Sequence, residues 1–161
     1  MPGSRGTFLL SLHAHHGRPV ELRDGTRVER GEPVAEIHFW NERIAAYAVA
    51  GTAELTWAFL RDLRADLRTL ATALAAMPPE RRPLAVYGVS TLADGAVRLG
   101  FETRPLPDGA GRRALSWWQG RVLGRAYRPV SGGGRTAHTS QEVWLSYASL
   151  QQRFGGKGSG A

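Results

Sequence analysis

A stripe of apolar residues between Glu54 and Met77 places the strongest constraint on how this chain can fold. Its members recur at steps of three and four, which is the period of one face of an α-helix. They are Leu60, Leu63, Leu67, Leu70, Leu74 and Met77. Phe59 and Ala71 widen the stripe, and charged residues lie off it. Because an amphipathic helix buries its apolar face, we expect this helix to cover a β-sheet, with a zipper to a partner helix as the alternative.

Residues 20–28 predict a β-hairpin, and the positions of the apolar side chains decide its register. A two-residue loop at Asp24-Gly25 would place apolar side chains opposite charged ones. A three-residue loop with Gly25 at positive φ instead places Val20 opposite Val28. We therefore expect the three-residue loop.

A third strand is predicted for Val34 to Phe39, after a bend at Gly31 and Pro33. Its side chains alternate between two faces. One face carries Ala35, Ile37 and Phe39, and the other carries Val34, Glu36 and His38. With the hairpin, this strand predicts an N-terminal antiparallel β-meander with one wetted side.

Shorter signals complete the fold prediction. Strands are expected over Phe8–Leu12, Leu84–Val89 and Phe101–Arg104, and a short helix over Ala93–Leu99 that stops at Gly100. A capping box at Thr139 and Glu142 predicts the start of a last helix, which Gly155 ends.

These elements predict a single α+β domain over residues 8–155, between a flexible N-terminus (residues 1–7) and a flexible tail (residues 156–161). Its sheet is expected to be mostly antiparallel and to begin with the meander. One long helix and shorter C-terminal helices are expected to cover it.

The 161-residue chain contains no cysteine, which excludes disulfides, thiolate zinc sites and cysteine nucleophiles. No apolar run approaches the ~20 residues that span a bilayer. We therefore expect a cytoplasmic protein without a transmembrane segment, with peripheral attachment to a membrane as the alternative.

The net charge of +7 is typical of proteins that bind nucleic acid or anionic membranes. Of the 21 basic residues, however, only Lys157 is a lysine, and the chain is rich in alanine and glycine. This composition also fits a coding bias, in which many arginines are ordinary solvated surface.

Residues 115–128 fit both a helix and a strand, and we favour the helix. One side of that helix would carry Trp117, Arg121, Arg125 and Arg128. Arginine binds phosphate and carboxylate groups through paired hydrogen bonds, and tryptophan stacks on bases or lies at a membrane interface. With Trp40, these residues are our candidates for binding an anionic glycan, lipid headgroup or nucleic acid. The alternative is a surface whose arginines extend their charged ends into water.

Histidines suggest two further candidate sites. His13 and His15 would point to the same side of a strand, a spacing that two metal ligands can use, and His38 or a carboxylate such as Glu36 would complete the site. The spacing, however, fixes no third ligand. A polar turn is therefore the alternative, and we expect no cofactor.

His38 is the leading candidate for acid–base chemistry. Burial and a carboxylate could tune its imidazole, and Glu36, Asn41 and Glu42 lie close in sequence. The alternative is a ring that hydrogen-bonds the backbone at the end of a strand. The sequence contains no P-loop, nucleophile elbow, metalloprotease motif or dinucleotide fingerprint.

Several short motifs occur in a fixed order along the chain. They are Asp24-Gly25-Thr26, Gly31-Glu32, Gly88-Val89-Ser90-Thr91-Leu92, Arg98-Leu99-Gly100-Phe101 and Val143-Trp144-Leu145-Ser146. In this order, and with the long helix between them, residues 20–155 resemble the YkoP-like domain of bacterial proteins. Relatives of that domain occur alone or attached to polysaccharide-deacetylase-type enzymes, which implies a carbohydrate or cell-envelope context. The resemblance carries over no catalytic residue, and the zinc ligands and catalytic aspartate of a deacetylase do not appear in this chain.

The leading hypothesis is a non-catalytic binding or interaction module that serves envelope glycan or glycolipid metabolism, with a protein partner as another ligand class. A nucleic-acid-binding protein that uses Arg121, Arg125 and Arg128 is the first alternative. A small enzyme centred on His38, with Glu36 or Glu42, is the second.

Overall fold

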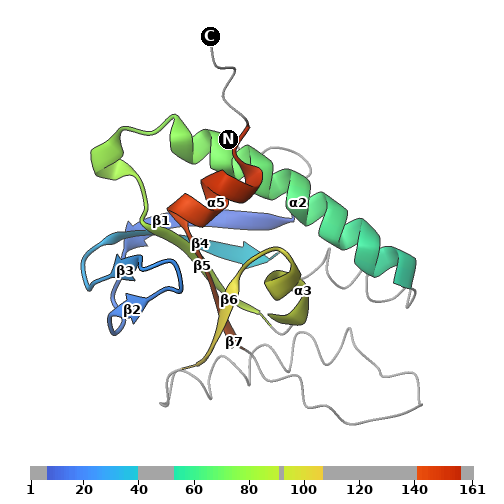
Figure 1. Cartoon of the computed structure of the whole chain (residues 1–161), viewed down its shortest axis with the longest axis horizontal. Helices are drawn as coiled ribbons and strands as arrows, with labels where there is room; N and C mark the ends of the chain where they lie inside the picture. Colours follow the sequence, from blue (N-terminus) through green and yellow to red (C-terminus); the bar gives the residue numbers. More distant parts are fainter. Residues whose placement is uncertain (1–6, 40–52, 91–92, 107–140, 157–161) are drawn as a thin grey trace.

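A computed structural model of the chain describes residues 7–39, 53–90, 93–106 and 141–156. Its main sheet has five strands in the order β1-β4-β5-β7-β6 (Figure 1). The strands are β1 (Phe8–Ala14), β4 (Pro33–Phe39), β5 (Ala85–Ser90), β6 (Glu102–Pro105) and β7 (Gln141–Ser146). The β4–β5 pair is parallel and the other three pairs are antiparallel. The predicted α+β class is confirmed.

Helices cover one face of this sheet. They are α2 (Ala53–Ala75), α3 (Ala93–Arg98) and α5 (Tyr147–Phe154), and a 3-10 turn, η1 (Pro79–Arg81), follows α2. The long helix α2 lies across the sheet with α5 beside it (Figure 1). The predicted apolar stripe is confirmed as the buried face of α2, because Leu63, Leu67, Leu70 and Leu74 are each at most 5% exposed. They pack against Ile37 of β4, among others.

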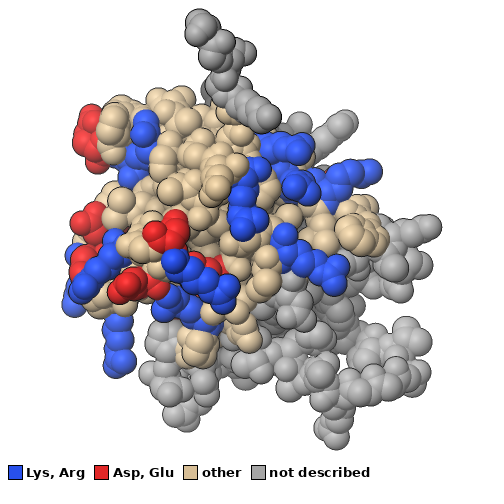
Figure 2. Space-filling view, viewed as in Figure 1, with Lys and Arg blue, Asp and Glu red and all other residues tan. Residues whose placement is uncertain are grey.

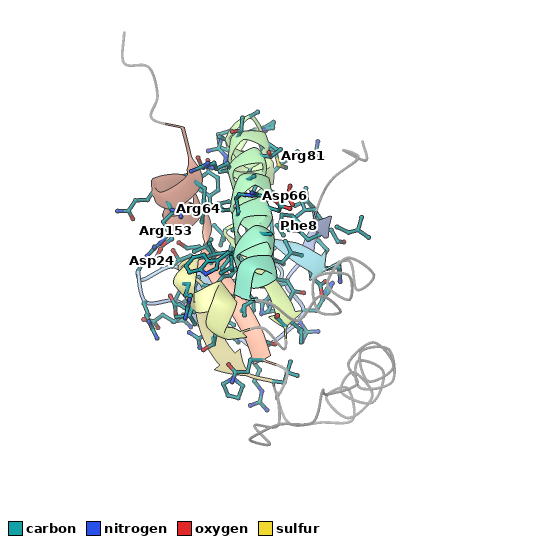
Figure 3. The ribbon with its side chains drawn as sticks, turned by 90° about the vertical axis from the view of Figure 1, so that its right-hand side faces the viewer. Phe8, Asp24, Arg64, Asp66, Arg81 and Arg153 are labelled. Carbon is teal, nitrogen blue, oxygen red and sulfur yellow. The ribbon has the colours of Figure 1, made fainter. Side chains whose placement is uncertain are left out.

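Hydrogen bonds fix the edge of the sheet to α2. The backbone N–H and the hydroxyl of Thr7, immediately before β1, both donate to Asp66 Oδ2 at 2.6 Å. Figure 3 shows Asp66 and Phe8 on the same side of α2. Figure 2 shows basic side chains over α2, and basic and acidic side chains intermixed over the β2–β3 side. No helix in the described ranges is long and apolar enough to cross a membrane.

The hairpin has the predicted register. It consists of β2 (Val20–Glu21) and β3 (Arg27–Val28), with Val20 opposite Val28. Gly25 has a φ of 84°, as the three-residue loop requires. The hairpin buries its apolar side chains against the face of the sheet that the helices leave free, where they contact Trp144.

The tip of the hairpin is fixed to the end of β7 and to α5. Asp24 accepts hydrogen bonds from Ser146 Oγ, from Ser149 Oγ at 3.2 Å and from the Thr26 backbone N–H at 3.0 Å. Burial raises the pKa of Asp24, but these hydrogen bonds outweigh it and hold the pKa below its ordinary value of 3.8. Asp24 therefore stabilises the fold in its ionised form.

The predicted N-terminal meander is wrong. The β2–β3 hairpin forms a separate two-stranded sheet, and β4 pairs with β1 instead of β3. The reason is the bend at Gly31, where φ is 95°. There the Gly31 N–H donates to the His15 carbonyl, and the His15 N–H donates to Glu32. These bonds align β4 with all seven residues of β1, a longer ladder than the two residues of β3 allow.

The predicted capping box is also wrong. Glu142 lies in β7, which pairs with β5 over six positions, and Thr139 lies outside the described residues. The last helix begins at Tyr147, and Ser146 caps it by accepting a bond from the Ser149 N–H at 2.9 Å. The reason is that Val143, Trp144 and Leu145 form a short apolar run that is buried between β5 and β6, and the segment pairs with both strands. The predicted end of the helix at Gly155 is confirmed.

Candidate functional site

A row of chemically active side chains crosses the sheet on the face opposite α2. The strand registers place Ser11 opposite Glu36, Glu36 opposite Tyr87 and Tyr87 opposite Trp144. Glu102 of β6 continues the row beyond Trp144. Because side chains at paired positions share a face, the row spans all five strands.

The centre of the row is the carboxylate of Glu36. Its Oε2 lies 3.0 Å from Nε2 of His13 and 3.6 Å from Nε2 of His38. Tyr87 also hydrogen-bonds to Glu36. We call these four residues the Glu36 cluster. The side chains of His13, Glu36 and His38 are 28%, 26% and 53% exposed, so a ligand in solution can reach them.

His13 connects the cluster to the backbone. Its Nδ1 donates to the Ala14 carbonyl oxygen at 2.8 Å, which leaves Nε2 facing Glu36 and, at 3.3 Å, the hydroxyl of Tyr87. Nε2 can accept a hydrogen bond from the Tyr87 hydroxyl or, when it carries a proton, donate a hydrogen bond to Glu36. The cluster therefore has two hydrogen-bonding arrangements that differ by one proton.

Tyr87 is held as a neutral phenol. Burial raises its pKa most, followed by the negative charge of Glu36, its hydrogen bond to Glu36 and the charge of Glu142. Its ring stacks on Trp144 with centroids 4.6 Å apart and planes at 17°. Trp144 is only 1% exposed and donates from Nε1 to Glu142 Oε2 at 3.0 Å. Trp144 is thus a rigid support for Tyr87 and is itself out of reach of a ligand.

His15 lies on the same face as His13 but in a different environment. Its ring is buried against Trp144, edge to face at 5.6 Å, and its Nε2 lies 2.8 Å from the Arg18 carbonyl oxygen. That nitrogen already has a protein partner. Within the described ranges, no group of three or more His, Asp or Glu residues is arranged to hold a metal ion.

The structure brings two of the predicted acid–base residues, Glu36 and His38, together with His13. The other predicted site residues lie outside the described part of the chain: Trp40, Asn41, Glu42, Trp117, Arg121, Arg125 and Arg128. The nucleic-acid hypothesis, which uses three of these arginines, stays a prediction. Sequence reasoning missed Tyr87, because only the order of the strands shows that β5 lies beside β4.

Comparison with known proteins identifies the family. The sequence model of the YkoP domain family matches residues 2–154 of the chain. The chain belongs to the YkoP domain family. The matched range contains all four residues of the Glu36 cluster. Searches of curated proteins and of solved structures gave no match to this YkoP domain.

Proposed function

We propose that this YkoP domain is a binding module that holds a hydroxyl-rich ligand, a glycan, on the Glu36 cluster. The observation that carries the proposal is the convergence of two imidazole nitrogens and a phenol on one partly exposed carboxylate. A carboxylate accepts hydrogen bonds from sugar hydroxyls, whereas imidazole and phenol groups both donate and accept them. A few such groups placed close together are enough to orient a ligand.

The electrostatics of the cluster favour a neutral or cationic sugar. Glu36 and Glu142 both place negative charge beside Tyr87, so an anionic ligand would be repelled there. Tyr87 is a neutral phenol at neutral pH, and it can therefore donate a hydrogen bond. The envelope context implied by the family resemblance fits glycans built from N-acetylglucosamine or from its deacetylated, positively charged form.

The test is a titration of the purified protein with N-acetylglucosamine oligomers and with glucosamine oligomers, followed by calorimetry. Glu36→Gln keeps the shape of the side chain and removes its charge, and we expect it to weaken binding about 10- to 100-fold, the loss for a hydrogen bond to a charged group. Glu80→Gln is the matched control, since Glu80 is exposed in η1 and belongs to no part of the cluster.

Glu80→Gln should bind like the wild type. The proposal is wrong if the wild type binds neither oligomer, or if Glu36→Gln binds as tightly as the wild type. Tighter binding of the glucosamine oligomers would identify the cationic sugar as the preferred ligand.

A small acid–base enzyme is the second candidate. Its support is the approach of Nε2 of both His13 and His38 to one oxygen of Glu36, an arrangement that can hold a proton and pass it on. In that case His38→Ala should lower turnover of a glycan substrate about 100-fold or more, while binding persists. Unchanged glycan composition after long incubation with the wild type would exclude this enzyme activity.

A further inference from the structure

The outer edge of β1 differs from the other edge of the sheet. β1 has seven residues, none of them Asp, Glu, Lys, Arg or Pro, and it exposes three leucines. Leu9, Leu10 and Leu12 are 53%, 40% and 48% exposed. The opposite edge, β6, has only four residues, Glu-Thr-Arg-Pro, whose charges and proline discourage further pairing. In the described part of the chain, no strand pairs with the outer edge of β1.

The backbone of β1 offers hydrogen-bonding groups to that edge. His15, just beyond the strand, donates its N–H to Glu32 and accepts from the Gly31 N–H, so both of its backbone groups face β4. In an antiparallel ladder this orientation alternates from residue to residue. The outward residues of β1 are therefore Phe8, Leu10, Leu12 and Ala14.

We propose that a second copy of this chain pairs with this edge, β1 against β1, about a two-fold axis at Ser11. Among antiparallel registers, this one pairs the full length of Phe8–Ala14 with itself. It places Leu10 opposite Leu12 of the second copy, and Phe8 opposite Ala14 of the second copy. All four are outward residues, so each pair exchanges two main-chain hydrogen bonds. The strand is thus complementary to itself, as a two-fold interface requires.

The side chains fit the same arrangement. Leu10 and Leu12 pair with Ile37 and Ala35 of β4 and therefore lie on the helix-covered face. They are half-exposed at the edge of the core, and the two-fold axis would bring both leucines of each copy into one apolar cluster. Because the axis is perpendicular to the sheet, the two Glu36 clusters would lie on the same face of one continuous sheet. The interface does not depend on the proposed ligand.

A cysteine cross-link tests the register, since the natural chain has no cysteine. In the Ser11→Cys variant the two cysteines face each other at a pair without main-chain bonds, where Cα atoms are ~4.5 Å apart, a separation that a disulfide accepts. Leu9→Cys is the matched control on the same strand and face. Its two copies would lie four positions apart, roughly 14 Å at ~3.4 Å per residue, which is beyond the reach of a disulfide.

Under mild oxidation, Ser11→Cys should form a covalent dimer at least about tenfold faster than Leu9→Cys. Equal rates, or no covalent dimer with Ser11→Cys, would overturn the proposal. Sedimentation gives an independent measurement. The wild type should be dimeric, and a Leu10→Lys/Leu12→Lys variant, checked for its fold by circular dichroism, should be monomeric. A monomeric wild type, or a double variant that folds and remains dimeric, would equally overturn it.

Discussion

Gly88 of β5 is paired with Ile37 of β4, and a methyl group at Gly88 should destabilise the fold. A Cβ at this position would lie 2.7 Å from the Ile37 carbonyl oxygen and 2.8 Å from Ile37 Cγ1. The carbonyl belongs to the backbone of the paired strand, so it cannot rotate away. Forced overpacking of a core costs about 1–3 kcal/mol. For a chain of 161 residues, Gly88→Ala should therefore lower Tm by about 2–12 °C.

Gly95→Ala is the matched control, because it adds the same methyl group to another glycine. Gly95 lies in α3, and its Cβ would have Leu60 Cδ2 at 3.5 Å as its nearest neighbour, an ordinary contact. Alanine in a helix is favoured over glycine by up to ~1 kcal/mol, so Tm should rise by up to about 4 °C. Differential scanning calorimetry measures both variants. A Gly88→Ala variant as stable as the wild type, or two variants shifted alike, would refute the reasoning.

Three further predictions concern stability. Because folding raises the pKa of Tyr87, the contribution of Tyr87 to folding stability is complete below pH 10.0, the ordinary pKa of the unfolded chain, and is lost as pH rises above it. Above pH 10, Tm of the wild type should therefore fall more steeply than Tm of Tyr87→Phe. Parallel curves would contradict this prediction. Folding lowers the pKa of Asp24, so the contribution of Asp24 to folding stability is present above pH 3.8 and is lost as pH falls below that value. Asp24→Ala should lower the unfolding free energy by about 1 kcal/mol at pH 7, and its difference from the wild type in urea titrations should shrink in acid. Leu67→Ala removes a fully buried side chain and should cost about 2–5 kcal/mol in the same titrations; a cost below 1 kcal/mol would contradict the packing of α2.

Local patterns predicted the elements whose signals are complete within a short stretch of sequence. The leucine stripe of α2 could be predicted because a period of 3.6 already specifies which residues share a face. The hairpin register could be predicted because only a three-residue loop aligns Val20 with Val28 and leaves the positive φ to Gly25. In both cases the residues that determine the structure lie within one helix or one hairpin.

The order of the strands could not be predicted, because it depends on pairing between distant parts of the chain. β4 follows β3 in sequence, yet it pairs with β1 on one side and with β5 on the other. β7 then inserts between β5 and β6. The structure of a short segment such as 141–146 also depends on the strands with which it pairs. Its six paired positions with β5 outweigh the helix signal of the apparent capping box.

The same non-local pairing creates the Glu36 cluster, because its members come from β1, β4 and β5. Folding alone does not require this chemistry. Each charged or polar group that is half-buried on a sheet face loses hydration, a cost that valine at the same position would avoid. The helix-covered face shows the apolar solution, with Ala35, Ile37 and Val86 at the intervening positions. A carboxylate with two imidazoles and a neutral phenol around it therefore fits the binding site that we propose, at some expense of stability.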